Sequence, residues 1–135
     1  MKKGKVKGRK PKTLDIAKSQ ETLDYDKHPP IFSLERVQAG NYCFSKLDDE
    51  NKASFAEAMF RRKTMTWSDI IRSDRHGLGT EKISRAAIKA PTDSVAHGDF
   101  LALRYKGKNP VVGYRQKNIF FVLWFDHNFS LYDHG

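Results

Sequence analysis

The sequence is poor in the features that mark secreted and membrane proteins. It contains a single cysteine, Cys43, so no intramolecular disulfide can form. Its longest apolar run, Ile119 to Phe125, is seven residues, whereas a membrane-spanning helix needs roughly 18. The basic N-terminus is not followed by the apolar segment of a secretory signal peptide. We therefore expect a cytoplasmic protein with no membrane partner.

Common motifs of cofactor binding and catalysis are also missing. The sequence has no phosphate-binding P-loop, no dinucleotide-binding GxGxxG motif and no cysteine-based zinc site. Asp126 and Asp133 are typical of a turn and a chain end rather than of the carboxylate pair of a glycosidase. No internal repeat with a period of about 20 to 50 residues is visible. We therefore expect a protein that uses neither a cofactor nor a metal ion.

The 135 residues fit one domain, and a content of 39% hydrophobic and 12% aromatic residues is enough to form its core. The formal net charge of +9 is distributed unevenly: residues 1–12 carry +7, residues 13–50 carry −4 and residues 51–135 carry +6. We interpret residues 1–30 as a flexible basic tail with an acid-leaning linker, and residues 31–135 as a single α+β domain. The tail either contacts nucleic acid or only aids solubility.

Two helices are predicted near the middle of the chain. Acidic residues open the segment at residues 49–63 and basic residues close it, an arrangement that the helix dipole favours. Thr66 and Asp69 have the spacing of a capping box and predict a second helix at residues 67–73. Alternation of apolar residues predicts a short strand before them, at residues 41–47.

The remainder of the chain predicts a sheet. A polar loop with two glycines, at residues 74–83, is a candidate functional surface. After it, alternating segments are typical of antiparallel strands at residues 100–105, 111–115, 119–126 and 129–132. The expected fold class is α+β: an antiparallel sheet of four to five strands with a helical hairpin on one face, in the order β-α-α-β-β-β.

The remaining polar side chains suit acid–base chemistry on phosphodiesters. Arginine binds phosphate oxygens, histidine exchanges protons near neutral pH, and tyrosine can polarise a phosphate or stack on a base. A metal-independent ribonuclease needs a base for the ribose 2′-hydroxyl, a cation for the phosphorane and an acid for the leaving oxygen. The candidates for these catalytic roles are Arg104, Arg115, His76, Tyr132 and His134.

Other basic side chains are predicted to bind RNA, namely Arg61, Arg62, Lys63, Arg75, Lys106, Lys108 and Lys117. Each candidate also has an ordinary structural interpretation, because a surface histidine is more often solvated and an arginine on a strand is more often half of an ion pair. The tryptophans and the aromatic residues of the last long apolar run are interpreted as core: Trp67, Trp124, Phe120, Phe121 and Phe125.

The chain from Asn41 to Gly135 resembles the RelE/HigB/ParE-type toxins of bacterial toxin–antitoxin modules. The resemblance lies in the order of strand, helical hairpin and meander, in the strand motif Gly113-Tyr114-Arg115, and in a C-terminal group of Tyr132, Asp133 and His134. It implies that Arg115 stabilises the phosphate and that His134 is the general acid or base. Tyr132 is implied to stack on a base or to position it.

The function implied by the resemblance is an endoribonuclease that cleaves mRNA at the ribosome and is neutralised by an antitoxin partner. One alternative is a non-catalytic nucleic-acid-binding protein of a phage or mobile element, which would bind phosphates through the tail and the basic body. Another is a ParE-like inhibitor that acts by protein contact, because such relatives share the fold and inhibit gyrase without cutting RNA.

Overall fold

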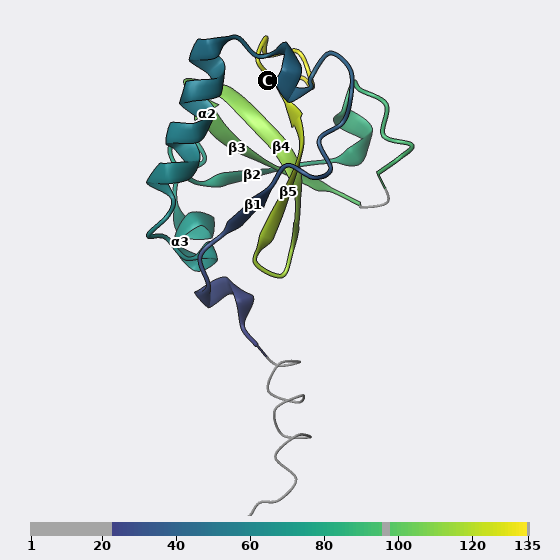
Figure 1. Cartoon of the computed structure of the whole chain (residues 1–135). Helices are drawn as coiled ribbons and strands as arrows, with labels where there is room; N and C mark the ends of the chain where they lie inside the picture. Colours follow the sequence, from purple (N-terminus) through teal and green to yellow (C-terminus); the bar gives the residue numbers. More distant parts are fainter. Residues whose placement is uncertain (1–22, 96–97, 135) are drawn as a thin grey trace, which may run out of the picture.

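The computed structural model describes residues 23–95 and 98–134 (Figure 1), so the predicted basic tail at residues 1–12 lies outside the described part. Five strands form one sheet in the order β1-β5-β4-β3-β2. Their bounds are β1 Ile31–Ser33, β2 Thr80–Ile83, β3 Phe100–Lys106, β4 Asn109–Gln116 and β5 Ile119–Phe125. Neighbouring strands are antiparallel except for β1, which runs parallel to β5. The predicted α+β class is confirmed, and the parallel edge strand is an addition to it.

Both predicted helices are confirmed, as α2 (Asp49–Arg61) and α3 (Trp67–Arg72). The side chain of Asp48 accepts a hydrogen bond from the backbone N–H of Asn51 and so caps the start of α2. At α3 the capping box is complete, because the side chains of Thr66 and Asp69 each accept a hydrogen bond from the other's backbone N–H. Figure 1 shows both helices on the same side of the sheet.

The strand predicted at residues 41–47 is wrong. These residues form a turn and a short 3-10 helix, Phe44–Lys46, and the first strand is Ile31–Ser33 instead. The apolar alternation there reflects rings that pack onto the core from outside the sheet, since the ring of Phe44 contacts those of Phe55 and Phe125 edge-on. The alternation of apolar residues at 41–47 therefore indicates burial of these side chains and not pairing with another strand.

Two further predictions near the ends of the sheet are wrong. Residues 80–83 of the predicted polar loop form β2, which pairs with β3 at the edge of the sheet, where an outward-facing polar side is tolerated. The strand predicted at residues 129–132 is a turn, in which Phe129 has a φ of 60° and leaves the extended conformation. The C-terminal residues are therefore free to fold back over the sheet rather than extend it.

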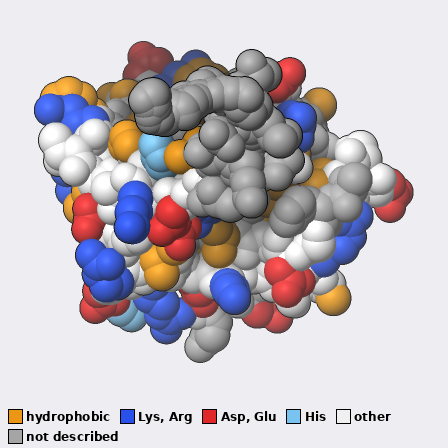
Figure 2. Space-filling view, turned by 90° about the horizontal axis from the view of Figure 1, so that it is seen from below, with side chains coloured by type: hydrophobic (Ala, Val, Ile, Leu, Met, Phe, Trp, Pro, Cys, Tyr) orange, Lys and Arg blue, Asp and Glu red, His pale blue; other side chains and the backbone are white. Residues whose placement is uncertain are grey.

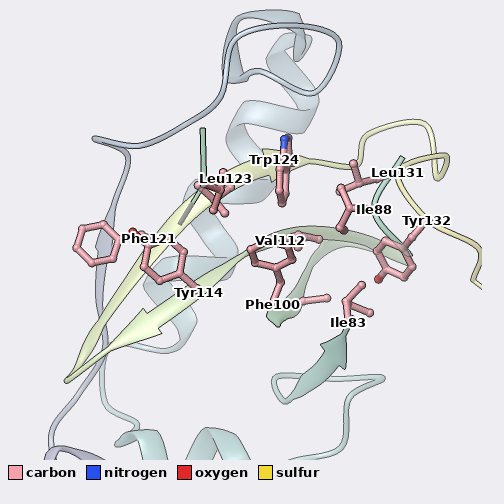
Figure 3. Close-up of a cluster of buried hydrophobic side chains, with 12 residues drawn as sticks. Ile83, Ile88, Phe100, Val112, Tyr114, Phe121, Leu123, Trp124, Leu131 and Tyr132 are labelled. Carbon is pink, nitrogen blue, oxygen red and sulfur yellow. The ribbon is translucent and has the colours of Figure 1, made fainter. Parts of the chain in front are cut away.

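The sheet is buried on both faces. The helix-covered face contains the rings of Trp67, Phe120 and Phe125 together with Leu103 and Val122. The other face carries a second cluster, shown in Figure 3, which is covered by the segment after β2 and by the C-terminal residues. Ile88, Leu131 and Tyr132 supply this cover in place of a third helix. The predicted core aromatic residues, including Trp124 and Phe121, are all buried.

A bulge in β5 changes the face of the sheet on which its last side chains lie. Val112 of β4 pairs with Trp124, but the next residue, Gly113, pairs with Val122, so Leu123 is an extra residue in β5. Because side chains alternate along a strand, one extra residue reverses the facing of everything beyond it. Leu123 and Trp124 consequently lie on the same face, away from the helices.

Residues 25–30 lie against the end of the helical hairpin. The carbonyl oxygen of His28 accepts a hydrogen bond from the backbone N–H of Trp67, at 3.0 Å. Asp26 forms an ion pair with Arg115, at 2.5 Å.

Among the described residues, no helix has the length and apolar character needed to cross a bilayer.

Candidate functional site

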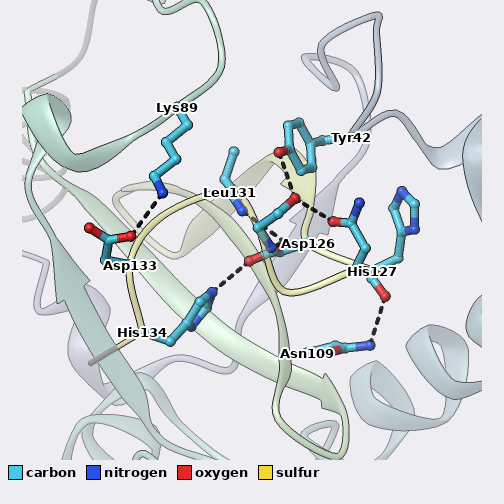
Figure 4. Close-up of polar contacts among 10 residues, drawn as sticks. Tyr42, Lys89, Asn109, Asp126, His127, Leu131, Asp133 and His134 are labelled. Carbon is cyan, nitrogen blue, oxygen red and sulfur yellow. Dashed lines mark hydrogen bonds and ion pairs between the residues drawn. The ribbon is translucent and has the colours of Figure 1, made fainter.

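The C-terminal residues form a tight turn around the carboxylate of Asp126, which is fully buried. Its Oδ1 accepts hydrogen bonds from the backbone N–H groups of Ser130, at 2.7 Å, and Leu131, at 3.0 Å. Leu131 is fully buried in the cluster on the far side of the sheet from the helices, so the turn is anchored by both polar and apolar contacts. The turn brings His134 back to the side chain of Asp126, as Figure 4 shows.

The second oxygen of Asp126 orients the imidazole of His134. Nε2 of His134 lies 2.8 Å from Oδ2 of Asp126, and the His134 side chain is only 12% exposed. A carboxylate can only accept here, so Nε2 carries the proton and Nδ1 is the nitrogen available to other groups. The ring is also held by aromatic contacts, with Phe129 stacked at a centroid distance of 3.5 Å and Tyr132 at 4.0 Å. The imidazole is therefore held by both polar and ring contacts.

A cleft of about 710 Å³ opens beside this imidazole, and its walls contain four of the five predicted catalytic residues. These are His76, Arg104, Tyr132 and His134. Two of the predicted RNA-binding residues, Arg75 and Lys108, lie in the same walls. The cleft is completed by Asp133, which the sequence places in the C-terminal group, and by four residues with no role predicted from the sequence, namely Glu81, Lys89, Phe129 and Ser130. The fold thus gathers candidates from the loop before β2, from β3 and from the C-terminus.

Strand geometry explains why Arg104 reaches the cleft. Phe100 and Ala102 of β3 face the cluster opposite the helices, and Arg104 follows them at the same two-residue spacing. The polar loop reaches the same place because it leads directly into β2, the neighbour of β3. Gly79 is required where this loop turns, since a Cβ there would collide with the backbone carbonyl of Ser73.

The hydroxyl of Tyr132 remains protonated at neutral pH. Burial raises the pKa of Tyr132 above its ordinary value, and the negative charges of Glu81 and Asp126 raise it further. A protonated phenol is a hydrogen-bond donor, so Tyr132 can donate to an anion but does not act as a base.

Ion pairs at the rim hold two of the cationic side chains. Arg75 pairs with Glu81 at 2.7 Å, and Lys89 pairs with Asp133 at 2.8 Å. The hydrogen bond and charge of Lys89 lower the pKa of Asp133. Because these four side chains are all well exposed, the pairs are weak and a competing anion can displace the carboxylates. Arg104 and Lys108 add further positive charge to the cleft walls.

Arg115, the fifth predicted catalytic residue, lies elsewhere. Its guanidinium pairs with Asp26 at 2.5 Å and sits 4.6 Å from the centroid of the Trp67 ring, on the helix-covered face. Arg104 pairs with Pro110 at the start of β4, whereas Arg115 is near its end, roughly 17 Å further along. The structure therefore does not bring Arg115 together with His134.

The predicted RNA-binding cations separate into three groups. Arg62 is fully buried, where it donates to the carbonyl oxygens of Ala58, Leu78 and Arg104, so this residue is not available to RNA in the described structure. Lys63 and Lys117 are exposed and lie near aromatic rings away from the cleft. Arg61 and Lys106 line a second cavity, described below, next to the cleft that holds Arg75 and Lys108.

The surface gives no broad patch of one charge on the face that Figure 2 shows. Blue and red side chains alternate there around the grey residues. Among the described residues, no group of three or more histidine, cysteine, aspartate or glutamate side chains is placed to hold a metal ion.

Sequence reasoning missed Asp126. Its position directly after an apolar strand and four residues before Ser130 is a signal for a turn closed by a carboxylate, but it predicts a turn residue and no contact with a histidine. Its proximity to His134 depends on how the chain folds back, for which the sequence has no spacing rule.

Comparison with protein-family models, with curated proteins and with solved structures finds no match for this chain.

Proposed function

We propose that this protein is a metal-independent endoribonuclease of toxin type, which cleaves mRNA at the ribosome in the cytoplasm and is neutralised by a cognate antitoxin. The observation that carries the proposal is the oriented imidazole of His134, held 2.8 Å from a fully buried carboxylate in a cleft that also contains Arg104 and Tyr132. An imidazole fixed in one tautomer by a carboxylate is suited to proton transfer near neutral pH.

The reaction assigns one step to each group. Nδ1 of His134 removes the proton from a ribose 2′-hydroxyl, and the 2′-oxygen attacks the adjacent phosphorus. Arg104 stabilises the charge of the phosphorane, and the protonated hydroxyl of Tyr132 donates to one of its oxygens. The bond from phosphorus to the 5′-oxygen breaks, and the imidazolium of His76 protonates that oxygen. The products are a 2′,3′-cyclic phosphate and a 5′-hydroxyl.

The resemblance of the sequence to RelE/HigB/ParE-type toxins supports the choice of mRNA, ribosome and antitoxin. In that resemblance Arg115 has the phosphate-stabilising role. We assign this role to Arg104 instead, because Arg104 shares the cleft with His134 and Arg115 is paired with Asp26 on the other face.

The decisive experiment compares wild-type protein, His134→Ala and Arg115→Ala on a labelled mRNA, free and bound to programmed ribosomes. We expect His134→Ala to cleave about 10²- to 10⁴-fold more slowly than wild type, while Arg115→Ala retains most of the activity. The new 3′-ends should be cyclic phosphates, and a single 2′-deoxy nucleotide at the cleavage position should block the cut.

Circular dichroism spectra of the three proteins control for folding. Equal cleavage by wild type and His134→Ala would overturn the assignment of His134. Tight RNA binding by wild type without cleavage in either setting would overturn the enzyme and favour the non-catalytic nucleic-acid-binding protein. Growth inhibition on induction without cleavage or RNA affinity would favour the inhibitor that acts by protein contact.

A further inference from the structure

A second cavity, of about 150 Å³, adjoins the cleft and shares His76 and Arg104 with it. Its other walls come from the end of α2, which supplies Arg61, and from the end of β3 and the turn after it, which supply Lys106 and Gly107. The loop before β2 closes it with Gly77 and Leu78. The cavity is thus a side chamber of the proposed catalytic cleft, formed where two of its elements meet the helical hairpin.

The charged residues that line this chamber are all cationic within the described part of the chain. They are Arg61, Arg104 and Lys106, and His76 can add a fourth positive charge when protonated. Lys106 forms an ion pair with Glu50 at 3.3 Å, but the Glu50 side chain is 74% exposed. Such a pair contributes little and exchanges readily for a better anion.

A buried guanidinium lies behind the chamber wall. Arg62 donates to the carbonyl oxygens of Leu78 and Arg104, two of the residues that line the chamber, at 3.2 Å and 3.3 Å. Burial, with a smaller contribution from the charge of Arg61, lowers the pKa of Arg62 to about 10. No ion pair of Arg62 with a described carboxylate accompanies these bonds. An anion in the chamber would therefore offset a charge that the fold leaves uncompensated.

We propose that this chamber is a phosphate subsite, which binds the RNA phosphate next to the one that is cleaved. The proposal rests on the proposed function and adds a second point of attachment for the strand. The chamber's small volume and its lining of arginine, lysine and imidazole suit a phosphate group rather than a nucleobase. His76 and Arg104, which face both cavities, set the spacing between the two phosphates.

The test measures binding by the full-length protein of uncleavable 2′-deoxy dinucleotides with no terminal phosphate, with a 5′-phosphate or with a 3′-phosphate. Wild type should bind one of the phosphorylated forms about tenfold more tightly, because the added phosphate accepts charge-assisted hydrogen bonds from the cationic lining. The affinity for that ligand should also fall more steeply with added salt than the affinity for the unphosphorylated dinucleotide.

The variants Arg61→Gln and Lys106→Gln should each lose most of this gain. Arg72→Gln is the matched control, because Arg72 is an exposed arginine on α3 that pairs with Asp69 and lines neither cavity. Inorganic phosphate is the second probe: a subsite for RNA predicts that it competes with the phosphorylated dinucleotide only at far higher concentration.

Equal affinity of wild type for all three dinucleotides would overturn the subsite, as would a gain that survives in the Arg61→Gln, Lys106→Gln double variant. Inorganic phosphate that binds as tightly as the dinucleotide would also overturn it, in favour of a free-anion site. These binding results are independent of the cleavage assay, so the phosphate subsite can be wrong while the proposed nuclease activity is correct. Conversely, if wild type fails to cleave RNA but still binds the phosphorylated dinucleotide more tightly, the proposed nuclease fails and the phosphate subsite stands.

Discussion

The side chain of Asp126 has two roles, because it stabilises the C-terminal turn and orients the imidazole of His134. Three hydrogen bonds converge on its carboxylate, two from the backbone of the C-terminal turn and one from His134. A buried carboxylate of this kind is tolerated because every bond is charge-assisted. The same side chain thus holds the turn and selects the tautomer of the imidazole.

Replacing the carboxylate of Asp126 with an amide distinguishes its role in the turn from its role in orienting the imidazole. In Asp126→Asn the amide oxygen can still accept from the turn, but its NH₂ group would face Nε2 of His134. The imidazole would then place its proton on Nδ1, and the base would be lost. We expect cleavage to fall about 10²- to 10⁴-fold, with a loss of roughly 1–3 kcal/mol in the free energy of unfolding.

Single-turnover cleavage and urea unfolding measure the two effects. The matched control is Asp49→Asn, because Asp49 is an exposed aspartate at the start of α2 that lines neither the cleft nor the second cavity. Its stability should change by less than about 1 kcal/mol, and its cleavage rate should remain close to wild type. A rate in Asp126→Asn equal to that of the control would contradict the role of the dyad.

The bulge between β4 and β5 determines that the side chain of Asp126 faces the cleft side of the sheet. Beyond Leu123 the facing of β5 is reversed, so Trp124 faces the cluster opposite the helices and Phe125 faces the helices. Asp126 continues this alternation toward the cleft side. Gly113 opposes the bulge, and a Cβ at this position would overlap the carbonyl oxygen of Phe121. Glycine inside a strand often marks such a close approach.

Gly113→Ala should therefore damage both the sheet and the site. The strands must separate to admit the methyl group, which we expect to cost roughly 1–3 kcal/mol or more in the free energy of unfolding, with loss of cleavage beyond that explained by the unfolded fraction. Thermal melting and cleavage below the melting midpoint measure this. Gly98→Ala is the control, since nothing lies within 4 Å of a Cβ there. Equal stability of the two variants would mean that β4 can adjust at the bulge.

Some elements followed from local rules and others did not. The capping box at Thr66 and Asp69 and the acidic start of α2 are encoded by neighbouring residues, and both helices were predicted almost to their ends. Residues 41–47 and 80–83 were assigned wrongly because their state depends on whether another strand lies beside them. For β2 that neighbour is β3, about 20 residues later in the chain.

At the scale of the whole molecule, two buried tyrosines contribute to the response of stability to alkaline pH. Burial raises the pKa of Tyr105 and of Tyr132 above their ordinary value, and the hydroxyl of Tyr105 donates to the side chain of Asn51. An unfolded tyrosine releases its proton near pH 10, while the folded one keeps it. The folded state then binds more protons, so stability falls as pH rises above about 10.

Tyr105→Phe should flatten this decline. The variant is expected to lose some stability at pH 7 with its hydrogen bond, but its melting temperature should fall less than that of wild type between about pH 10 and pH 11.5. The lowered pKa of Arg62 has the opposite sign and is common to both proteins, so it cancels in the comparison. Parallel declines in the two proteins would contradict a raised pKa for Tyr105.

The sequence by itself determined the helices, the aromatic core and the α+β class, because caps and apolar periodicity act over a few residues. It also identified His76, Arg104, Tyr132 and His134 as chemical candidates, since those residue types are suited to phosphodiester chemistry. Only the tertiary structure decided which of them meet. The face on which a side chain lies depends on strand alternation, which places Arg104 in the same cleft as His134 and leaves Arg115 on the opposite face. The extra residue at the bulge in β5 turns Asp126 toward the cleft side, where it is the partner of the imidazole.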